Sequence, residues 1–245
     1  MAENEMVFYK TYRCPVCDGQ FKNLTVKQGK ARLLGTDIDL KPNFADIETL
    51  KYDVCLCPVC GYASVERYFG KISAFQRKQI LENISKSFKT VFPQNDTISF
   101  DEAVIRYKFA ILTCQVKGSK ESEFGFLCLK LGWLYRAYAA SLNPSEDESK
   151  IKELNKQEDA FLLKAMDYFV VARANEQSPI CGMDEMTYDC LLAALMIRFE
   201  RFSDAKRLLG SVITSRTASK RVKDKARELK DIIMEKAGDD EEDDE

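Results

Sequence analysis

Cys14-Pro15-Val16-Cys17 and Cys57-Pro58-Val59-Cys60 are two copies of one four-residue motif, and they decide how the N-terminal part of this chain folds. Each motif is a tight turn that brings two thiol groups to one side of the backbone. Two such turns supply the four sulfur ligands of a tetrahedral site, which is the coordination that zinc takes in structural sites. The sequence therefore predicts one structural Zn²⁺ per chain, bound by Cys14, Cys17, Cys57 and Cys60.

Residues 1–70 are predicted to form a small, β-rich zinc-ribbon module around this site. Residues 8–13 lead into the first motif, residues 21–26 alternate as in a half-buried strand, and residues 31–34 and 52–56 are further β-prone segments. Gly19 and Gly61 follow the motifs, where the chain must turn under the sulfur atoms. Residues 37–46 are polar and are expected to form a loop. So small a sheet buries little apolar surface, and metal binding is therefore expected to be a condition of folding.

Cys55 offers a competing thiol beside the second motif. In a strand, Cys55 and Cys57 point to the same face, so an exchange of ligands is geometrically feasible. Only Cys57 with Cys60 repeats the spacing of the first motif, and the site is assigned to that pair. The role of Cys55 stays open: it is a residue without a function at the site, an alternate ligand or a redox partner. The simplest alternative is that Cys55 and the four CPxC cysteines are all buried thiols that bind no metal.

Composition narrows the class of protein. The chain has 245 residues, 45% hydrophobic and 31% charged, which is typical of a soluble globular protein of one large or two modest domains. Its nine cysteines, the lack of a secretory signal and the lack of a long apolar run lead us to expect a cytoplasmic protein without a membrane span. Histidine is absent, and four thiolates leave no open coordination position, so we expect a non-enzymatic protein.

The rest of the chain is predicted to be helical, so the fold class is α+β, mostly α. Residues 71–98 are expected to form a linking helix and loop, and residues 99–237 a tetratricopeptide-like helical domain. Leu131-Gly132-Trp133-Leu134-Tyr135 matches the first helix of such a repeat, and Ala165-x-x-x-Phe169-x-x-Ala172 has the spacing of the second. A second unit follows Asp184, and the polar residues 143–158 are expected to form an enlarged loop.

Repeats of this kind bind extended or helical peptides on their concave surface. Counting from Gly132 and Ala193 predicts six partner-binding residues: Phe126, Leu129, Trp133, Arg136, Ile197 and Arg198. The alternative is that Trp133 belongs to the core and that the two arginines form a solvated face. The sequence thus predicts a zinc-binding adaptor that holds a protein or peptide partner in its helical groove.

The basic residues and the cysteines of the N-terminal module suggest two alternative functions. One is a nucleic-acid-associated regulator that uses the ribbon, where Lys22, Lys27, Lys30 and Arg32 are the main basic candidates. The other is a thiol redox sensor, in which oxidation of the ligands releases zinc. The basic run over 220–230 is predicted to be the solvated face of a final helix, and residues 238–245, which end in seven acidic residues, to be a disordered tail.

The order of these parts resembles a bacterial family, domain-of-unknown-function family 2225. The residues that carry the resemblance are the first CPVC with Gly19, the stretch 35–39 before Pro42, the stretch 52–63, and Trp133-Leu134-Tyr135-Arg136. The resemblance implies a zinc-ribbon-like N-terminus and a tetratricopeptide-like C-terminus in a soluble bacterial protein. Members of the family usually have a hydrophobic or aromatic residue where this chain has Cys55, which favours keeping Cys55 out of the metal shell. The resemblance implies no activity.

Overall fold

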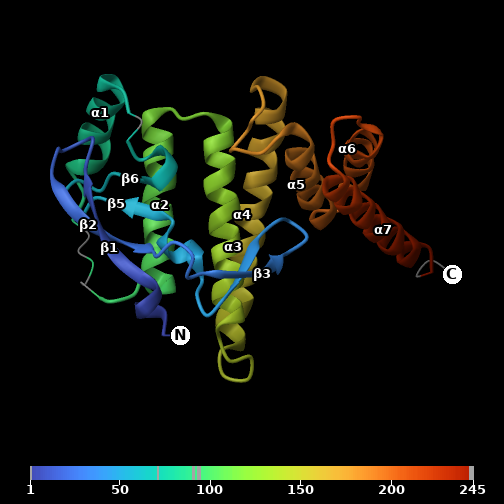
Figure 1. Cartoon of the computed structure of the whole chain (residues 1–245), viewed down its shortest axis with the longest axis horizontal. Coiled ribbons are helices and arrows are strands. Elements are labelled where there is room, and N and C mark those ends of the chain that lie inside the picture. Colours follow the sequence, from blue (N-terminus) through green and yellow to red (C-terminus); the bar gives the residue numbers. More distant parts are fainter. Residues whose placement is uncertain (1, 71, 90–91, 93–94, 243–245) are drawn as a thin grey trace. The chain divides into compact units, whose positions relative to one another are not determined.

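The computed structural model describes residues 2–70, 72–89, 92 and 95–242, and it is mostly helical, with short antiparallel strand pairs near the N-terminus (Figure 1). This is the α+β, mostly α class predicted from the sequence. The chain forms two compact units. Unit 1 comprises residues 1–35 and 42–165, and unit 2 comprises residues 36–41 and 166–245. The division therefore falls at residue 165, inside the region predicted to be one helical domain.

Three strand pairs lie in the N-terminal quarter of the chain. The six strands are β1 (Val7–Arg13), β2 (Gln20–Val26), β3 (Arg32–Thr36), β4 (Pro42–Ala45), β5 (Val54–Leu56) and β6 (Ala63–Val65). β1 pairs with β2 along its whole length, and β5 pairs with β6 so that Leu56 lies opposite Ala63. β4 corrects the expected loop over 37–46: Pro42 occupies the first position of a strand, where proline is tolerated.

The helices of unit 1 begin and end where local capping directs them. They are α1 (Ala74–Ile80), continued by a π-helical turn over Leu81–Ser85, then α2 (Phe100–Lys117), α3 (Glu121–Ala140) and the first part of α4 (Glu148–Asn175). The Ser99 side chain accepts a hydrogen bond from the Glu102 N–H at the start of α2, and Gly118 ends this helix in the left-handed conformation. The short turn after Gly118 returns α3 along α2, and the two helices lie side by side (Figure 1).

The segment 143–158, predicted to be an enlarged loop, is mostly helix. The turn between α3 and α4 ends at Asp147, whose N–H donates to the Asn143 carbonyl at 2.9 Å, and α4 begins at the next residue. Glu148 pairs with Lys152 one turn later at 2.6 Å. Oppositely charged residues four positions apart stabilise a helix. The polar composition therefore indicated an exposed helical face and not a loop.

Gly132 has the role that its place in the repeat pattern predicted. A Cβ atom at Gly132 would lie 2.7 Å from the Leu162 Cδ2 atom, far inside van der Waals contact. An alanine at this position would force the Leu162 side chain to move, so glycine suits the close approach of α3 and α4.

Unit 2 is a helical unit built around α5 (Glu185–Arg198), with α6 (Phe202–Thr214) and α7 (Lys220–Glu242) packed against it. Every residue from 188 to 197 is buried, which identifies α5 as the central helix. α7 runs to Glu242, so it continues into the segment that was expected to be a disordered tail; residues 243–245 lie outside the described residues. Among the described residues, no helix is both long and apolar enough to cross a membrane.

Candidate metal centre

The two CPxC motifs fold into turns of the same backbone geometry. In the first, the Asp18 N–H donates to the Cys14 carbonyl at 3.0 Å; in the second, the Gly61 N–H donates to the Cys57 carbonyl at 3.0 Å. Asp18 and Gly61 both have a positive φ, 60° and 74°. The residue that matches Gly61 is therefore Asp18 and not Gly19, which corrects the expectation that a glycine makes both turns. Aspartate tolerates this conformation better than most residues.

These two turns bring Cys14, Cys17, Cys57 and Cys60 together. Their four Sγ atoms all lie within 4.8 Å of one another, and the pairs Cys14–Cys60 and Cys17–Cys57 are each 3.6 Å apart. A tetrahedral ion with metal–sulfur bonds of about 2.3 Å requires sulfur–sulfur distances of about 3.8 Å. The four cysteines predicted from the sequence thus form a cluster that can bind a metal ion. Three of the four are buried, and Cys17 is half-buried.

The four thiol groups of the cluster change one another's pKa values. Thiol groups of Cys14 and Cys60 donate hydrogen bonds that stabilise a thiolate on Cys57 and lower the pKa of Cys57. The hydrogen bond with Cys57 raises the pKa of Cys14, and that with Cys14 raises the pKa of Cys60. Four thiolates this close together repel one another, so a counter-charge is needed for all four sulfur atoms to ionise. A divalent ion removes this conflict and favours four thiolates.

Residues of the helical segment 74–85, which follows the strands, form hydrogen bonds with both CPxC turns. The Arg77 side chain of α1 donates to the Val16 carbonyl at 2.7 Å and to the Asp18 carboxylate at 2.6 Å. The Ser85 hydroxyl donates to the Cys60 carbonyl at 2.9 Å. Both motifs are thus held from the same segment, 74–85. Its apolar residues share one core with the cysteines, and this core contains Cys14, Val16, Phe21, Cys55, Cys57, Cys60, Tyr62, Phe69, Ile80 and Ile84.

Cys55 belongs to this core but not to the group of four. Its thiol accepts a hydrogen bond from the Asn23 amide at 3.8 Å, and burial raises the pKa of Cys55 to about 11. Among the described residues, only the four CPxC cysteines make up a close group of this kind. Cys55 therefore lies outside the group of four, which fits the assignment of the site to the two motifs of equal spacing.

Gly61 gives a direct test of the packing around the second motif. A Cβ atom there would lie 2.5 Å from the Phe88 Cδ2 atom, whereas at Gly29, which has nearly the same φ of 75°, nothing lies within 4 Å. Gly29→Ala is expected to lose about 1 kcal/mol of unfolding free energy from backbone strain alone. Gly61→Ala is expected to lose a further 1–3 kcal/mol, roughly, because Phe88 must move. Urea unfolding of the two zinc-loaded variants measures this difference, and equal losses would contradict the packing described here.

The structure divides the six predicted partner-binding residues and buries half of them. Phe126, Leu129, Trp133 and Arg136 belong to unit 1, and Ile197 and Arg198 to unit 2. The side chains of Leu129, Trp133 and Ile197 are 0%, 6% and 4% exposed, so these three pack inside the protein. Arg136 donates to the buried Glu158 carboxylate at 2.8 Å. The binding role of the six residues stays a prediction, but the alternative assignment of Trp133 to the core fits its burial.

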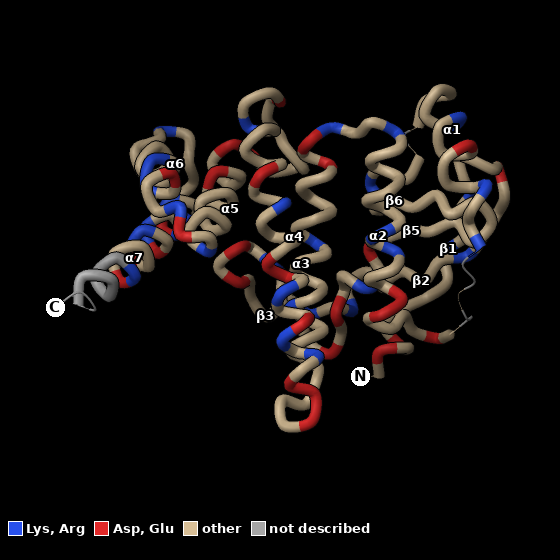
Figure 2. The backbone as a smooth tube through the Cα atoms, turned by 180° about the vertical axis from the view of Figure 1, so that it is seen from behind, with Lys and Arg blue, Asp and Glu red and all other residues tan. Residues whose placement is uncertain are grey.

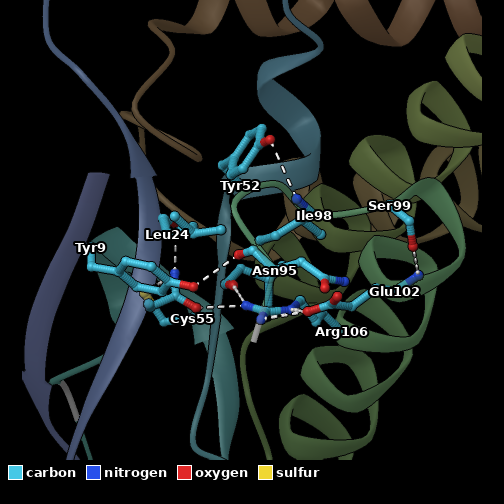
Figure 3. Close-up of polar contacts among 11 residues, drawn as sticks. Tyr9, Leu24, Tyr52, Cys55, Asn95, Ile98, Ser99, Glu102 and Arg106 are labelled. Carbon is cyan, nitrogen blue, oxygen red and sulfur yellow. Dashed lines mark hydrogen bonds and ion pairs between the residues drawn. The ribbon is translucent and has the colours of Figure 1, made fainter. Parts of the chain in front are cut away.

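A buried polar network in unit 1 was missed from the sequence. The Arg106 guanidinium of α2 donates to the Glu102 carboxylate at 2.7 Å, to the Asn23 amide oxygen at 2.5 Å and to the Val54 carbonyl at 3.4 Å. Figure 3 shows Arg106 between Glu102 of its own helix and the strands that carry Cys55 and Leu24. The signal was present as an acid and an arginine four residues apart. Nothing in that spacing says whether the pair faces water or the core.

The sequence model of one family, described as "Uncharacterized protein conserved in bacteria (DUF2225)", matches residues 7–233. The match covers both units and all four cysteines of the cluster. No curated protein and no solved structure matches the chain.

Proposed function

Because this chain belongs to that family of uncharacterized bacterial proteins, we propose its function from its own residues: a non-enzymatic, zinc-stapled adaptor that binds a protein partner through its second unit. The observation that carries the proposal is the closed set of four sulfur atoms within 4.8 Å of one another. Four thiolates favour zinc, and they leave no position for water or a substrate. The metal then serves the fold and not a reaction.

Zinc in this position supports the rest of unit 1. The hairpin of β5 and β6 carries the second motif, and it packs against α2. The Ala63 N–H of this hairpin donates to the Thr113 hydroxyl of α2 at 3.3 Å. Fixing the two motifs to one ion therefore also fixes the sheet residues on which α2 rests. We infer that the ion holds unit 1 as a rigid base, since so few strand residues cannot do so alone.

Unit 2 supports the binding half of the proposal. α5 and α7 begin at Glu185 and Lys220, 35 residues apart, which is close to the 34-residue period of tetratricopeptide repeats. In that arrangement α5 and α7 are the first helices of successive repeats, and these helices line the surface that binds peptides. The proposed binding surface therefore lies between α5 and α7 of unit 2. The groove residues predicted on α3 belong to unit 1 and are not part of this proposed surface.

The test is capture and reconstitution with the zinc-loaded protein. We expect affinity capture from the native bacterium to recover a protein that rebinds the purified chain with one-to-one stoichiometry in titration calorimetry. Because the proposed role is binding alone, intact masses of both proteins are expected to stay unchanged after incubation. Failure of every captured protein to rebind, or a change in the mass of the partner, would count against an adaptor. Nucleic-acid binding and redox sensing stay the alternatives predicted from the sequence.

A further inference from the structure

The segment Thr36–Lys41 is a turn that belongs to unit 2, although the residues on both sides of it belong to unit 1. The Asp37 N–H donates to the Lys41 carbonyl at 2.8 Å and the Leu40 N–H to the Asp37 carbonyl at 3.0 Å, so the turn is closed on itself. We call residues 36–41 the tip. Two of its charged residues, Asp39 and Lys41, are each only 4% exposed. Burial of charged side chains in so short a turn indicates that the tip is packed and not a free loop.

The tip forms one wall of a large cavity of unit 2. This cavity, of about 1090 Å³, is lined by Thr36 and Leu40 of the tip, by the first turns of α5 and by the first turns of α7. These are the two helices whose 35-residue spacing makes them the walls of a repeat groove. A piece of the same chain therefore forms part of the wall of the groove where the proposed partner would bind.

The charged side chains of the cavity lining that are left without an ion pair among the described residues are positive. Its acidic groups are used within unit 2: the Asp184 carboxylate accepts from the Thr187 N–H at 3.0 Å, Asp224 pairs with Arg227 at 2.6 Å, and Glu228 pairs with Lys225 at 3.1 Å. Two cations of the lining, at the start of α7, make no ion pair with any residue that the structure describes: Lys220 and Arg221.

The position of these two cations gives the fold no benefit. Both are exposed and lie in the first turn of α7, where the helix dipole disfavours positive charge. Lys and Arg recur along α6 and α7 (Figure 2), but this pair stands at the cavity. A carboxylate of a bound segment would supply the missing counter-charge, and arginine binds carboxylates with two parallel hydrogen bonds.

We propose that the tip is an internal occupant of the groove between α5 and α7, and that the partner segment recognised there is a short acidic and aliphatic stretch of the tip's own kind. The tip reads Thr-Asp-Ile-Asp-Leu-Lys, in which carboxylates alternate with aliphatic side chains. A partner segment of this character places its carboxylates at Lys220 and Arg221 and competes with the tip. Because the tip is tethered, it competes at a high effective concentration and weakens binding from solution. This inference rests on the proposed adaptor function and names its site and its ligand class.

The test uses a fluorescent peptide with the sequence of residues 33–44 and the full-length, zinc-loaded chain. The double variant Asp39→Ala/Leu40→Gly removes a buried carboxylate and an aliphatic wall of the cavity. Glycine suits the φ of 67° at Leu40, so the turn itself is kept. In fluorescence anisotropy, the peptide is expected to bind this variant at least about tenfold more tightly than the unaltered chain, because the tethered competitor is gone.

A second test reverses the charge of the two cations in the cavity lining. Adding Lys220→Glu and Arg221→Glu to the double variant is expected to abolish peptide binding, and these exposed positions keep the fold intact, as circular dichroism and zinc content can verify. A peptide with asparagine in place of both aspartates is expected to bind at least about tenfold more weakly, since it offers no carboxylate. Equal binding to the unaltered chain and the tip variant, or binding that survives the charge reversal, would overturn the inference.

Cys190 reports on the cavity without any peptide. Its thiol lines the cavity and is 3% exposed. In the tip variant, alkylation of Cys190 by a maleimide is expected to be at least about tenfold faster, because opening of this wall exposes the thiol. An unchanged rate contradicts the proposed occupancy. If the peptide does not bind the tip variant while a captured protein still binds the chain, this inference fails and the adaptor function stands. If the peptide binds but no captured protein rebinds, the adaptor function alone fails.

Discussion

Replacing Cys57 by serine is expected to abolish zinc binding and to unfold the cysteine core of unit 1. Cys57 lies at 0% exposure in the centre of this core, and its sulfur is 3.6 Å from that of Cys17. Structural zinc contributes an apparent free energy of about 10–16 kcal/mol in small zinc modules. That is as large as the whole unfolding free energy of a typical domain, about 5–15 kcal/mol. Loss of the ion is therefore expected to exceed what the remaining contacts of the core can offset.

Three measurements follow this change. Metal analysis is expected to give one zinc per unaltered chain and none for Cys57→Ser, and cobalt substitution of the unaltered chain is expected to give the absorption of a tetrahedral tetrathiolate site. Hydrogen exchange is expected to lose protection in β1, β2, β5 and β6 and to keep it in α5 and α6, since these helices form a separate compact unit.

Cys55→Ser is the matched control. Cys55 is as buried as Cys57, belongs to the same core and lies two positions away, but its thiol is outside the group of four. This variant is expected to retain one zinc and to lose only about 1–3 kcal/mol, the cost of placing a hydroxyl in an apolar site. The assignment of the metal shell is wrong if Cys55→Ser loses the ion, or if Cys57→Ser keeps it.

The second large effect is expected at Arg106, where methionine should lower the unfolding free energy of unit 1 by about 3–5 kcal/mol. The side chains of Arg106 and Glu102 are 12% and 9% exposed, and Asn23 shares the same guanidinium. Removing the arginine leaves a buried carboxylate and a buried amide without their partner. Urea unfolding of the zinc-loaded variant measures this loss.

Lys152→Met is the control for Arg106→Met, because Lys152 and Glu148 form an ion pair of the same helical spacing in the same unit, at 2.6 Å and with side chains 75% and 72% exposed. An exposed pair of this kind is expected to contribute no more than about 0.5 kcal/mol. Adding Glu102→Met to Arg106→Met is expected to restore part of the loss, since it removes the buried charge. Losses of equal size at Arg106 and Lys152 would show that burial does not set the cost.

Local features of the sequence predicted most of the elements and all four cysteines of the cluster. A CPxC turn is formed by six or so consecutive residues, and Ser99 and Gly118 cap α2 through contacts within one helical turn. The error at 143–158 arose because polar composition does not separate a loop from a helix with two charged faces. That helix is held by pairs such as Arg136–Glu158, whose partners are 22 residues apart.

The partner groove could not be located in the same way. Repeat spacing identified helices that can line a groove, but which face of a helix stays open depends on every other element that packs on it. Trp133 and Ile197 satisfied the pattern and are buried. Lys220 and Arg221 are exposed, as their assignment to a solvated face predicted, but nothing in their spacing indicated that they line a cavity of unit 2.

Residue types and short spacings were enough to predict the grouping of the four CPxC cysteines, the fold class and the close approach at Gly132. The packing of distant elements was needed to show that Glu102 and Arg106 are buried, and that residues 36–41 pack with helices that begin more than 140 residues later. The physical reason is the same in each case. Burial and long-range contact are properties of the surface that several elements form together, and no single stretch of sequence carries them.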